Sequence, residues 1–287
     1  MFHTSNSLPP TADEGVEEII VCRSARLSPA AYQFYCAVLL TFVRCGKAPE
    51  PATVRRFAAR LGVPFQATLS SMAAQDLVQR DSATGRIRAA YPFSGVPTAH
   101  RVTLFADHGG APSDLNGRSV NGDIHDIQVF AMCALDALGI PLMLGRAAEI
   151  VSQDAISGEP IRVEICPTAD LTRDPAHPNR LLPLHQWSAT WEPADAVVYA
   201  RPEEHEAEHD TGKCIAAGSC CPVTNFFACR ANAGAWASQH QTAGDGIVLA
   251  QQEALARAYA LFAGVLDRDI RANRTSMANQ TEGEGGA

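Results

Sequence analysis

The chain has 287 residues and a mass of 30.6 kDa, enough for roughly two domains at about 150 residues each. Hydrophobic residues make up 46% and charged residues 19%, a composition that fills a core and excludes wholesale disorder. The 31 acidic and 23 basic residues give a net charge of −8, which argues against a protein that mainly grips nucleic-acid phosphates. No run approaches the ~18–20 apolar residues of a membrane span, and no secretory signal is visible. We therefore expect a cytoplasmic protein whose nine cysteines are free thiols, with no membrane partner and with nucleic acid an unlikely partner.

The segment from 28 to 91 has the periodicity of helices followed by a hairpin. Ser28 is a suitable N-cap and Gly46 a suitable helix end. The pattern predicts helices over 29–45, 52–61 and 65–75 and a hairpin that pairs 77–80 with 86–89. Three helices and a two-stranded wing form a winged-helix arrangement. Such a unit either binds DNA or serves only as a packing module, and the acidic chain favours the packing module.

Beyond residue 91 the pattern changes to short alternating stretches separated by turn residues, which is typical of strands. It predicts strands over 101–105, 161–165, 196–199, 224–228 and 246–250. It predicts helices over 129–138, 236–240 and 253–270, the first of them ended by Pro141. We therefore predict an α+β fold, in which a winged-helix-like N-terminal helical domain precedes a mainly antiparallel sheet core with flanking helices.

Composition divides this chain into four parts. We predict a disordered lead-in over 1–20, the winged-helix-like domain over 21–92, the α+β core over 93–270 and a flexible tail over 271–287. Two stretches of the core, near 168–195 and 203–217, are rich in Pro, His, Asp and Glu and are predicted to be loop insertions.

Cys133 and Asp136 lie three positions apart in the predicted helix, so both side chains occupy one face with Cβ atoms about 5–6 Å apart. A cysteine in an apolar helix is usually a small core residue. A carboxyl beside it is harder to explain structurally, because burial without a partner is costly or raises the pKa of the carboxyl. A thiol and a carboxyl on one buried face can exchange a proton, which gives the pair a chemical interpretation.

The adjacent pair Cys220 and Cys221 is the second candidate feature. On an extended strand neighbouring side chains point to opposite faces, so one sulfur would face a site, whereas in a loop both could. The pair lacks the Cys-x-x-Cys spacing of structural zinc but suits a soft ion with few thiolate ligands. Two structural thiols are the alternative.

The remaining histidines and cysteines give weaker evidence for a functional site. His205, His209 and Cys214 could outline a metal site, although the acidic stretch around them favours a solvated surface. Core packing is expected for the remaining cysteines, which are Cys22, Cys36, Cys45, Cys166 and Cys229. The sequence contains no Walker A, dinucleotide, zinc-protease or nucleophile-elbow motif, so nucleotide-dependent chemistry has no support.

The chain resembles the organomercurial lyases, also called alkylmercury lyases. The segments that carry the resemblance are, in order, 91–102, 133–138, 144–147, 219–221, 226–228 and 236–241. Each segment alone is weak evidence, whereas the ordered set is specific and covers most of 28–270. The family combines a winged-helix-like N-terminal region with an α+β catalytic core, so the resemblance implies the fold predicted above.

The resemblance implies cleavage of a carbon–mercury bond by protonation, which gives a hydrocarbon and Hg(II). By motif, Cys133 matches the first essential cysteine, Asp136 the essential aspartate and Cys220 the second essential cysteine, while Cys221 matches a less central neighbour. A one-residue adjustment after Cys221 leaves the choice between Cys220 and Cys221 open. The implied mercury ligands are Cys133 and Cys220 with Cys221 beside them, and no added cofactor is implied.

The residue types fit this chemistry, because thiolates outcompete oxygen and nitrogen ligands for soft mercury. One thiolate would capture the organomercury cation and a second would make the bound carbon more basic. Asp136 would take a thiol proton and return it to the carbon. The implied partners are organomercurial thiol adducts as substrates, and small thiols or a mercuric reductase as acceptors of Hg(II). Where family members often carry a further cysteine shortly after the Gly-Arg motif, the chain has Val151 to Asp154, a departure that removes no chemical thiol.

Two other functions remain possible from the sequence. The chain could be a thiol-based heavy-metal-responsive regulator with its winged helix on DNA, or a non-catalytic mercury-binding protein. Asp136 discriminates among them, because a sensor needs thiolates but has no use for a proton donor beside them.

Overall fold

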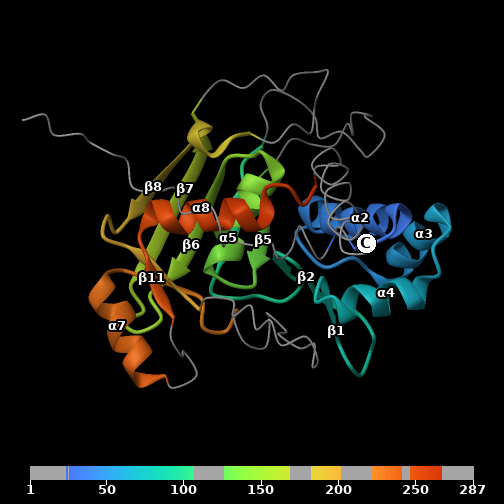
Figure 1. The fold of residues 1–287 in the computed structure, drawn as a ribbon, viewed down its shortest axis with the longest axis horizontal. Helices are drawn as coiled ribbons and strands as arrows, with labels where there is room; N and C mark the ends of the chain where they lie inside the picture. Colours follow the sequence, from blue (N-terminus) through green and yellow to red (C-terminus); the bar gives the residue numbers. More distant parts are fainter. Residues whose placement is uncertain are drawn as a thin grey trace, which may run out of the picture.

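The computed structural model describes residues 24, 26–106, 126–168, 182–201, 221–240 and 246–266. The N-terminal helices gather at one end of the molecule (Figure 1). They are α2 (Pro29–Cys45), α3 (Pro51–Leu61) and α4 (Phe65–Ala74), and the hairpin of β1 (Val78–Arg80) and β2 (Ile87–Ala90) follows. Ser28 Oγ accepts a hydrogen bond from the Ala31 N–H at the start of α2, and Gly46 ends this helix with a φ of 65°. Since glycine adopts that conformation without strain, the predicted boundaries are confirmed.

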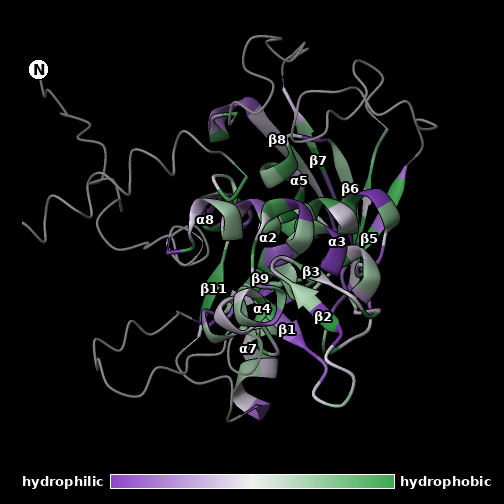
Figure 2. Ribbon diagram, turned by 90° about the vertical axis from the view of Figure 1, so that its right-hand side faces the viewer, coloured by the Kyte–Doolittle hydropathy of each residue, from purple (hydrophilic) through white to green (hydrophobic). Residues whose placement is uncertain are grey.

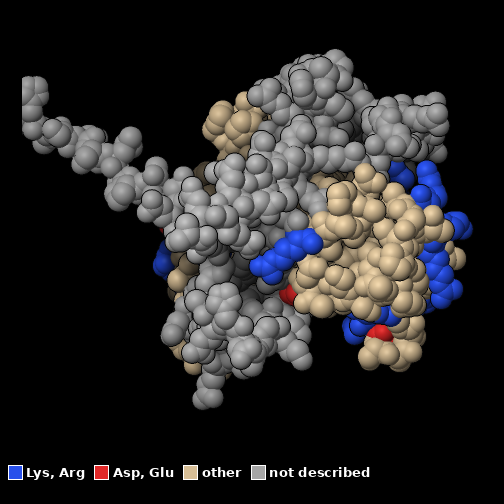
Figure 3. Space-filling view, turned by 45° about the vertical axis from the view of Figure 1, so that its right-hand side comes forward, with Lys and Arg blue, Asp and Glu red and all other residues tan. Residues whose placement is uncertain are grey.

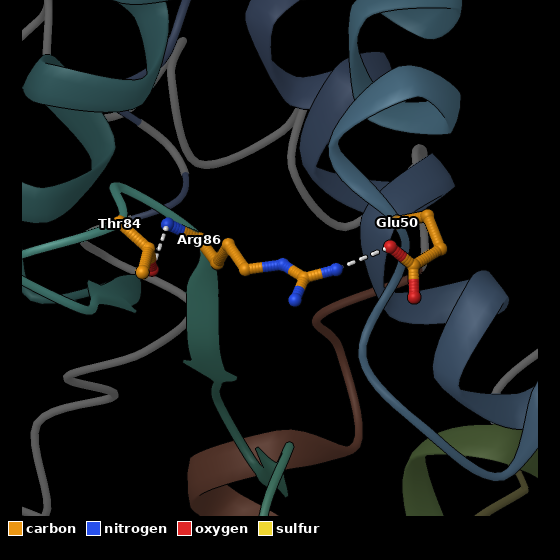
Figure 4. A network of polar contacts seen from close by, with 3 residues as sticks. All are labelled: Glu50, Thr84 and Arg86. Carbon is orange, nitrogen blue, oxygen red and sulfur yellow. Dashed lines mark hydrogen bonds and ion pairs between the residues drawn. The ribbon is translucent and has the colours of Figure 1, made fainter.

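The β1–β2 hairpin connects the helices to the main sheet. Arg86 forms an ion pair of 2.5 Å with Glu50, and its backbone N–H donates to Thr84 Oγ1 at 3.4 Å (Figure 4). β2 also pairs with β3 (Phe93–Ser94), so the hairpin forms one edge of the eight-stranded sheet. The predicted hairpin is confirmed, whereas the winged-helix description and the domain boundary near residue 92 stay predictions.

An antiparallel sheet with strand order β1-β2-β3-β5-β4-β6-β7-β8 forms the centre of the fold. The remaining strands are β4 (Arg101–Leu104), β5 (Ile127–Ala131), β6 (Ala148–Gln153), β7 (Pro160–Pro167) and β8 (Trp187–Glu192), the last preceded by the 3-10 helix η1 (Leu184–Gln186). The buried side chains of β7 alternate with exposed ones, as in a sheet with one covered face. The prediction of a mainly antiparallel sheet is therefore confirmed.

One predicted insertion contains part of this sheet. β8 lies within 168–195, and its residues Trp187 and Trp191 are buried, so the interpretation of that whole stretch as a loop is wrong. Two buried tryptophans four positions apart place two large apolar side chains on the same face of a strand, which outweighs the polar residues around them. The other predicted insertion, the lead-in over 1–20 and the tail over 271–287 lie outside the described residues.

A smaller sheet with strand order β10-β9-β11 completes the described strands. It contains β10 (Asn225–Phe227), β9 (Val197–Ala200) and β11 (Ile247–Leu249), and α7 (Arg230–Gln239) packs against it. A separate apolar cluster joins α7 to this sheet through Tyr199, Phe227 and Trp236. α8 (Gln251–Phe262) packs along α5 (Ala134–Leu144), as Figure 1 shows.

Helix α5 differs from the helix predicted over 129–138. Val129 belongs to β5, and the helix continues through Pro141 to Leu144. Ten of its 11 residues are buried between the main sheet and α8, and its hydrophobic colouring contrasts with the hydrophilic parts of α3 (Figure 2). Gly139 permits this packing, because a Cβ there would overlap the Phe262 ring. Burial on all sides outweighs the cost of an internal proline, about 3 kcal/mol, so the prediction that Pro141 ends the helix is wrong.

Charge is distributed unevenly along the chain. Residues 26–94 contain nine Lys and Arg but three Asp and Glu, although the whole chain has a net charge of −8. Figure 3 shows basic side chains along the rim of the helical end. α4, however, contains no charged residue. Among the described residues, none of the helices combines the length and the apolar character needed to cross a membrane.

Candidate active site

Cys133 is the N-cap of α5 rather than a residue on its face. Its backbone is extended, with φ −149° and ψ −179°, and its Sγ accepts a hydrogen bond of 3.5 Å from the Asp136 N–H. Asp136 is therefore the third residue of the helix, and both side chains lie over its first turn. Cys133 and Asp136 are therefore close together, as the three-residue spacing predicted. Their proximity results from the N-cap position of Cys133 and not from a shared helical face.

Cys221 reaches the same point from a turn 85 residues further along the chain than Asp136. The Ala134 N–H, at the start of α5, donates to the Thr224 carbonyl at 3.2 Å, and the Thr224 N–H donates to the Cys221 carbonyl at 3.4 Å. The first N–H groups of a helix have no partner within it, so they are available to bind this turn. The backbone thus fixes the 221–224 turn against the N-terminus of α5.

The three side chains meet closely. The Cys221 thiol donates to Asp136 Oδ2 at 3.7 Å. One ligand atom each from Cys133, Asp136 and Cys221 lies within 4.8 Å of the other two. In the part of the chain that the structure describes, no second group of three such side chains is found. The arrangement offers two soft ligands and one carboxylate at a single point.

The site is shielded from solvent. Cys133 and Asp136 are 5% and 2% exposed, whereas Cys221 is half-buried. Burial raises the pKa of the Cys133 thiol well above its usual value, and its hydrogen bond to Cys221 and the charge of Asp136 raise it further. A hydrogen bond from Cys133 lowers the pKa of Cys221, but burial and Asp136 outweigh it, so that pKa is raised as well. Both thiols therefore keep their protons until a base removes one, and Asp136 is within reach to do so.

The structure places the other predicted residues as follows. Cys220, His205, His209 and Cys214 lie outside the described residues, as does Cys22. Cys36 is buried, as expected of a core residue, whereas Cys45 is exposed, so its assignment to the core is wrong. Cys166 and Cys229 have intermediate exposure.

Tyr91 is a site residue that the sequence did not reveal. Its hydroxyl lies 3.6 Å from Cys221 Sγ, and the residue is 2% exposed. Its position at the start of the family-like segment 91–102 was a signal of importance but not of a contact with a sulfur.

His100 joins strands next to the site. Its Nδ1 lies 2.9 Å from Ser152 Oγ on β6, and its ring contacts Phe226 edge to face on β10. Burial lowers the pKa of His100 to about 4, although a hydrogen bond with Asn225 opposes the change. A neutral imidazole thus links β10, which follows the Cys221 turn, to the main sheet.

Asp154 fixes the other end of β10. Its Oδ2 accepts hydrogen bonds from the Ala228 N–H at 2.7 Å and from Asn232 Nδ2 at 2.8 Å, and its Oδ1 accepts from the N–H groups of Ile156 and Ser157. Burial works against ionisation, but these hydrogen bonds outweigh it and lower the pKa of Asp154. The carboxylate therefore binds the β6–β7 turn to the segment between β10 and α7.

Comparison with known proteins agrees with this site. The family model described as MerB, alkylmercury lyase, matches residues 120–179 and 182–263, which contain Cys133, Asp136 and Cys221. The chain belongs to the alkylmercury lyase family. The resemblance seen in the sequence motifs is therefore confirmed.

One curated relative and one solved structure extend the comparison. An alkylmercury lyase of Pseudomonas putida is 29% identical over 113 residues, which are 39% of this chain and 42% of that protein, so the match spans less than half of the relative's length. The crystal structure of the mercury-bound form of MerB2 has a TM-score of 0.56 and 20% sequence identity, and the match covers 87% of this chain and 98% of that chain. This second likeness shows a shared fold, including the N-terminal end that precedes the residues matched by the family model.

Proposed function

We propose that the protein is an alkylmercury lyase that cleaves the carbon–mercury bond of alkyl- and arylmercury compounds, giving a hydrocarbon and Hg(II). The observation that supports this most is the meeting of two thiols and one carboxyl within 4.8 Å. Thiolates bind soft mercury, and the carboxyl can carry a proton to carbon. Membership of the family supports the same activity.

The first step is capture of the substrate. Asp136 takes the proton of the Cys221 thiol, which already donates to its Oδ2. The resulting thiolate attacks the mercury of R–Hg–SR′ and displaces the carrier thiolate R′S⁻, which takes a proton from water. Cys221 is the first ligand in this scheme because its thiol already donates to Asp136, the base that removes its proton.

The second step breaks the carbon–mercury bond. Cys133 binds the mercury as a second sulfur ligand and gives its own proton to the hydroxide that was left when the carrier thiolate took a proton from water. The second thiolate adds electron density and makes the bound carbon more basic. Asp136 delivers a proton to that carbon, and R–H leaves with the electron pair of the broken bond. Overall, R–Hg–SR′ and two protein thiols give R–H, R′SH and Hg(II) bound by two thiolates. Protons and electrons balance without an added cofactor.

We assign the second chemical thiol to Cys221 in place of the predicted Cys220. Cys221 Sγ contacts Asp136 and Tyr91, and the turn that carries it is fixed against α5. Because Cys221 already supplies the sulfur that contacts Asp136, we expect Cys220 to be dispensable. Cys220 is a candidate acceptor of Hg(II) from the Cys133 and Cys221 thiolates.

The alternative functions fit less well. In a winged-helix regulator α4 would be the helix that reads DNA, yet it carries no Lys or Arg to contact phosphates. We retain the winged-helix-like description of residues 21–92 only as an architecture, and nucleic acid remains an unlikely partner. A non-catalytic mercury-binding protein would not need Asp136 against a thiol, since a buried carboxyl adds nothing to soft-metal affinity.

The setting of the activity follows from the chemistry. Organomercurial thiol adducts are the expected substrates, and small thiols or a mercuric reductase are the expected acceptors of Hg(II). We place the protein in the cytoplasm, because nine cysteines suit a reducing compartment.

The test is to mix the purified protein with phenylmercury and an excess of a small thiol, and to measure benzene by gas chromatography. Catalytic benzene release supports the lyase. Stoichiometric binding of mercury without benzene would replace the lyase by a binding protein.

A further inference from the structure

Tyr91 provides a polar contact to the thiol pair in addition to that of Asp136. Its hydroxyl lies 3.6 Å from Cys221 Sγ, while that thiol donates its own proton to Asp136 Oδ2 at 3.7 Å. A phenol has one O–H to donate, and a sulfur whose hydrogen points at Asp136 still has lone pairs to accept it. The three groups therefore form a line in which Tyr91 donates to Cys221 and Cys221 donates to Asp136.

The backbone around Tyr91 is fixed on both sides of the site. The Met132 N–H, directly before Cys133, donates to the Pro92 carbonyl at 3.3 Å. On the other side, the Tyr35 hydroxyl of α2 donates to the Tyr91 carbonyl at 2.9 Å. Tyr91 thus joins the segment that carries Cys133 to the sulfur of Cys221, and the N-terminal helices support it.

We propose that Tyr91 is a positioning residue for the cleavage of organomercurials, whose hydroxyl holds the Cys221 sulfur and stabilises it as a thiolate when Asp136 takes its proton. This inference rests on the proposed function, and it adds a fourth side chain to the chemical set. It also gives the N-terminal helices a role at the site, because Tyr35 holds the residue that contacts the sulfur.

The physical reason is that the hydrogen bond strengthens as the reaction starts. A neutral thiol sulfur is a weak acceptor, whereas a hydrogen bond to an ionised group is roughly twice as strong as a neutral one. The Tyr91 hydroxyl therefore favours the charged form of Cys221 over the neutral form.

The decisive variant is Tyr91→Phe, which removes the hydroxyl and keeps the ring. Without mercury, the rate of Cys221 alkylation by iodoacetamide at neutral pH, followed by mass spectrometry of its peptide, should fall about 10-fold, since one hydrogen bond to a charged group is lost. In turnover of the phenylmercury thiol adduct, kcat/KM should fall by a similar factor. A merely structural loosening would have the opposite effect on alkylation, because it would expose the sulfur.

Tyr32→Phe is the matched control. Tyr32 is also buried, and its hydroxyl donates to the Val265 carbonyl at 2.8 Å, which lies outside the thiol cluster. This variant should alkylate at the wild-type rate. Unchanged or faster alkylation in Tyr91→Phe, or an equal loss in Tyr32→Phe, would overturn the inference.

A second variant covers the case in which Tyr91→Phe does not fold. Tyr35→Phe removes the hydrogen bond that holds the Tyr91 carbonyl and should slow the alkylation of Cys221 by a smaller factor, so a wild-type rate would contradict the positioning role. Absence of benzene from the wild type would refute the lyase, while the alkylation ratios would still decide the role of Tyr91.

Discussion

Replacing Asp136 with asparagine should stop protonolysis while leaving mercury binding intact. Asparagine has nearly the size of aspartate and keeps the backbone N–H that donates to Cys133 Sγ at 3.5 Å. What it lacks is the carboxyl that accepts the Cys221 proton at 3.7 Å and returns it to carbon. A positioned general acid or base contributes about 10²- to 10⁴-fold, so kcat for benzene release should fall by a factor in this range. Both sulfurs remain, so one Hg(II) should still bind per chain.

The assay measures benzene by gas chromatography and protein-bound mercury after desalting, with the same preparation used for both. Asp81→Asn is the matched control, because Asp81 also accepts hydrogen bonds from backbone and side chain but lies on the exposed β1–β2 hairpin. The control should equal the wild type in both measurements. Turnover of Asp136→Asn within threefold of the wild type would refute the role of the carboxyl as proton carrier. A parallel loss of mercury binding would show that the substitution acts on the ligands instead.

Two further predictions concern the scaffold around the site. Asp154→Ala leaves the buried Ala228 N–H without the acceptor that it contacts at 2.7 Å, so the free energy of unfolding in urea should fall by about 1–3 kcal/mol. Asp81→Ala should cause a much smaller change, and equal changes would contradict the account. His100 has a pKa of about 4 in the folded chain, below the usual value of about 6.5, so protons bind preferentially to the unfolded chain between these values. Its contribution to stability is therefore complete above pH ~6.5 and falls by about 3 kcal/mol as the pH approaches 4. His100→Asn should remove that slope from the pH dependence of unfolding, and an unchanged slope would show that another group causes it.

Local signals in the sequence were sufficient for most of the elements. The left-handed glycine at Gly46 and the N-cap at Ser28 fix α2, and alternating apolar residues identify β7. The predictions for α5 and β8 were wrong because tertiary packing outweighs the local preference of the sequence for secondary structure. Helix α5 accommodates Pro141 because the helix is buried on every side. Strand β8 forms within a polar stretch of sequence because its two tryptophans are buried in the core. Neither effect is visible without knowing what covers the element.

The site was predictable in its residue types but not in its geometry. The spacing of Cys133 and Asp136 indicated proximity, yet only the structure reveals that Cys133 caps the helix. The choice between Cys220 and Cys221 depends on a turn fixed by a backbone hydrogen bond from Ala134 to Thr224, a long-range contact that spacing does not encode. The hydroxyl of Tyr91 reaches Cys221 across 130 residues of chain, which is likewise a product of the fold.

The two serine variants of the vicinal cysteines, compared in a single turnover, test the central claim most directly. Serine keeps the shape of cysteine but replaces the soft sulfur by a hard oxygen, which mercury binds poorly. With one equivalent of phenylmercury per chain, Cys220→Ser should release benzene at the wild-type rate, and Cys221→Ser should release almost none. Full activity in Cys221→Ser together with its loss in Cys220→Ser would contradict the assignment of Cys133, Asp136 and Cys221 as the group that breaks the carbon–mercury bond.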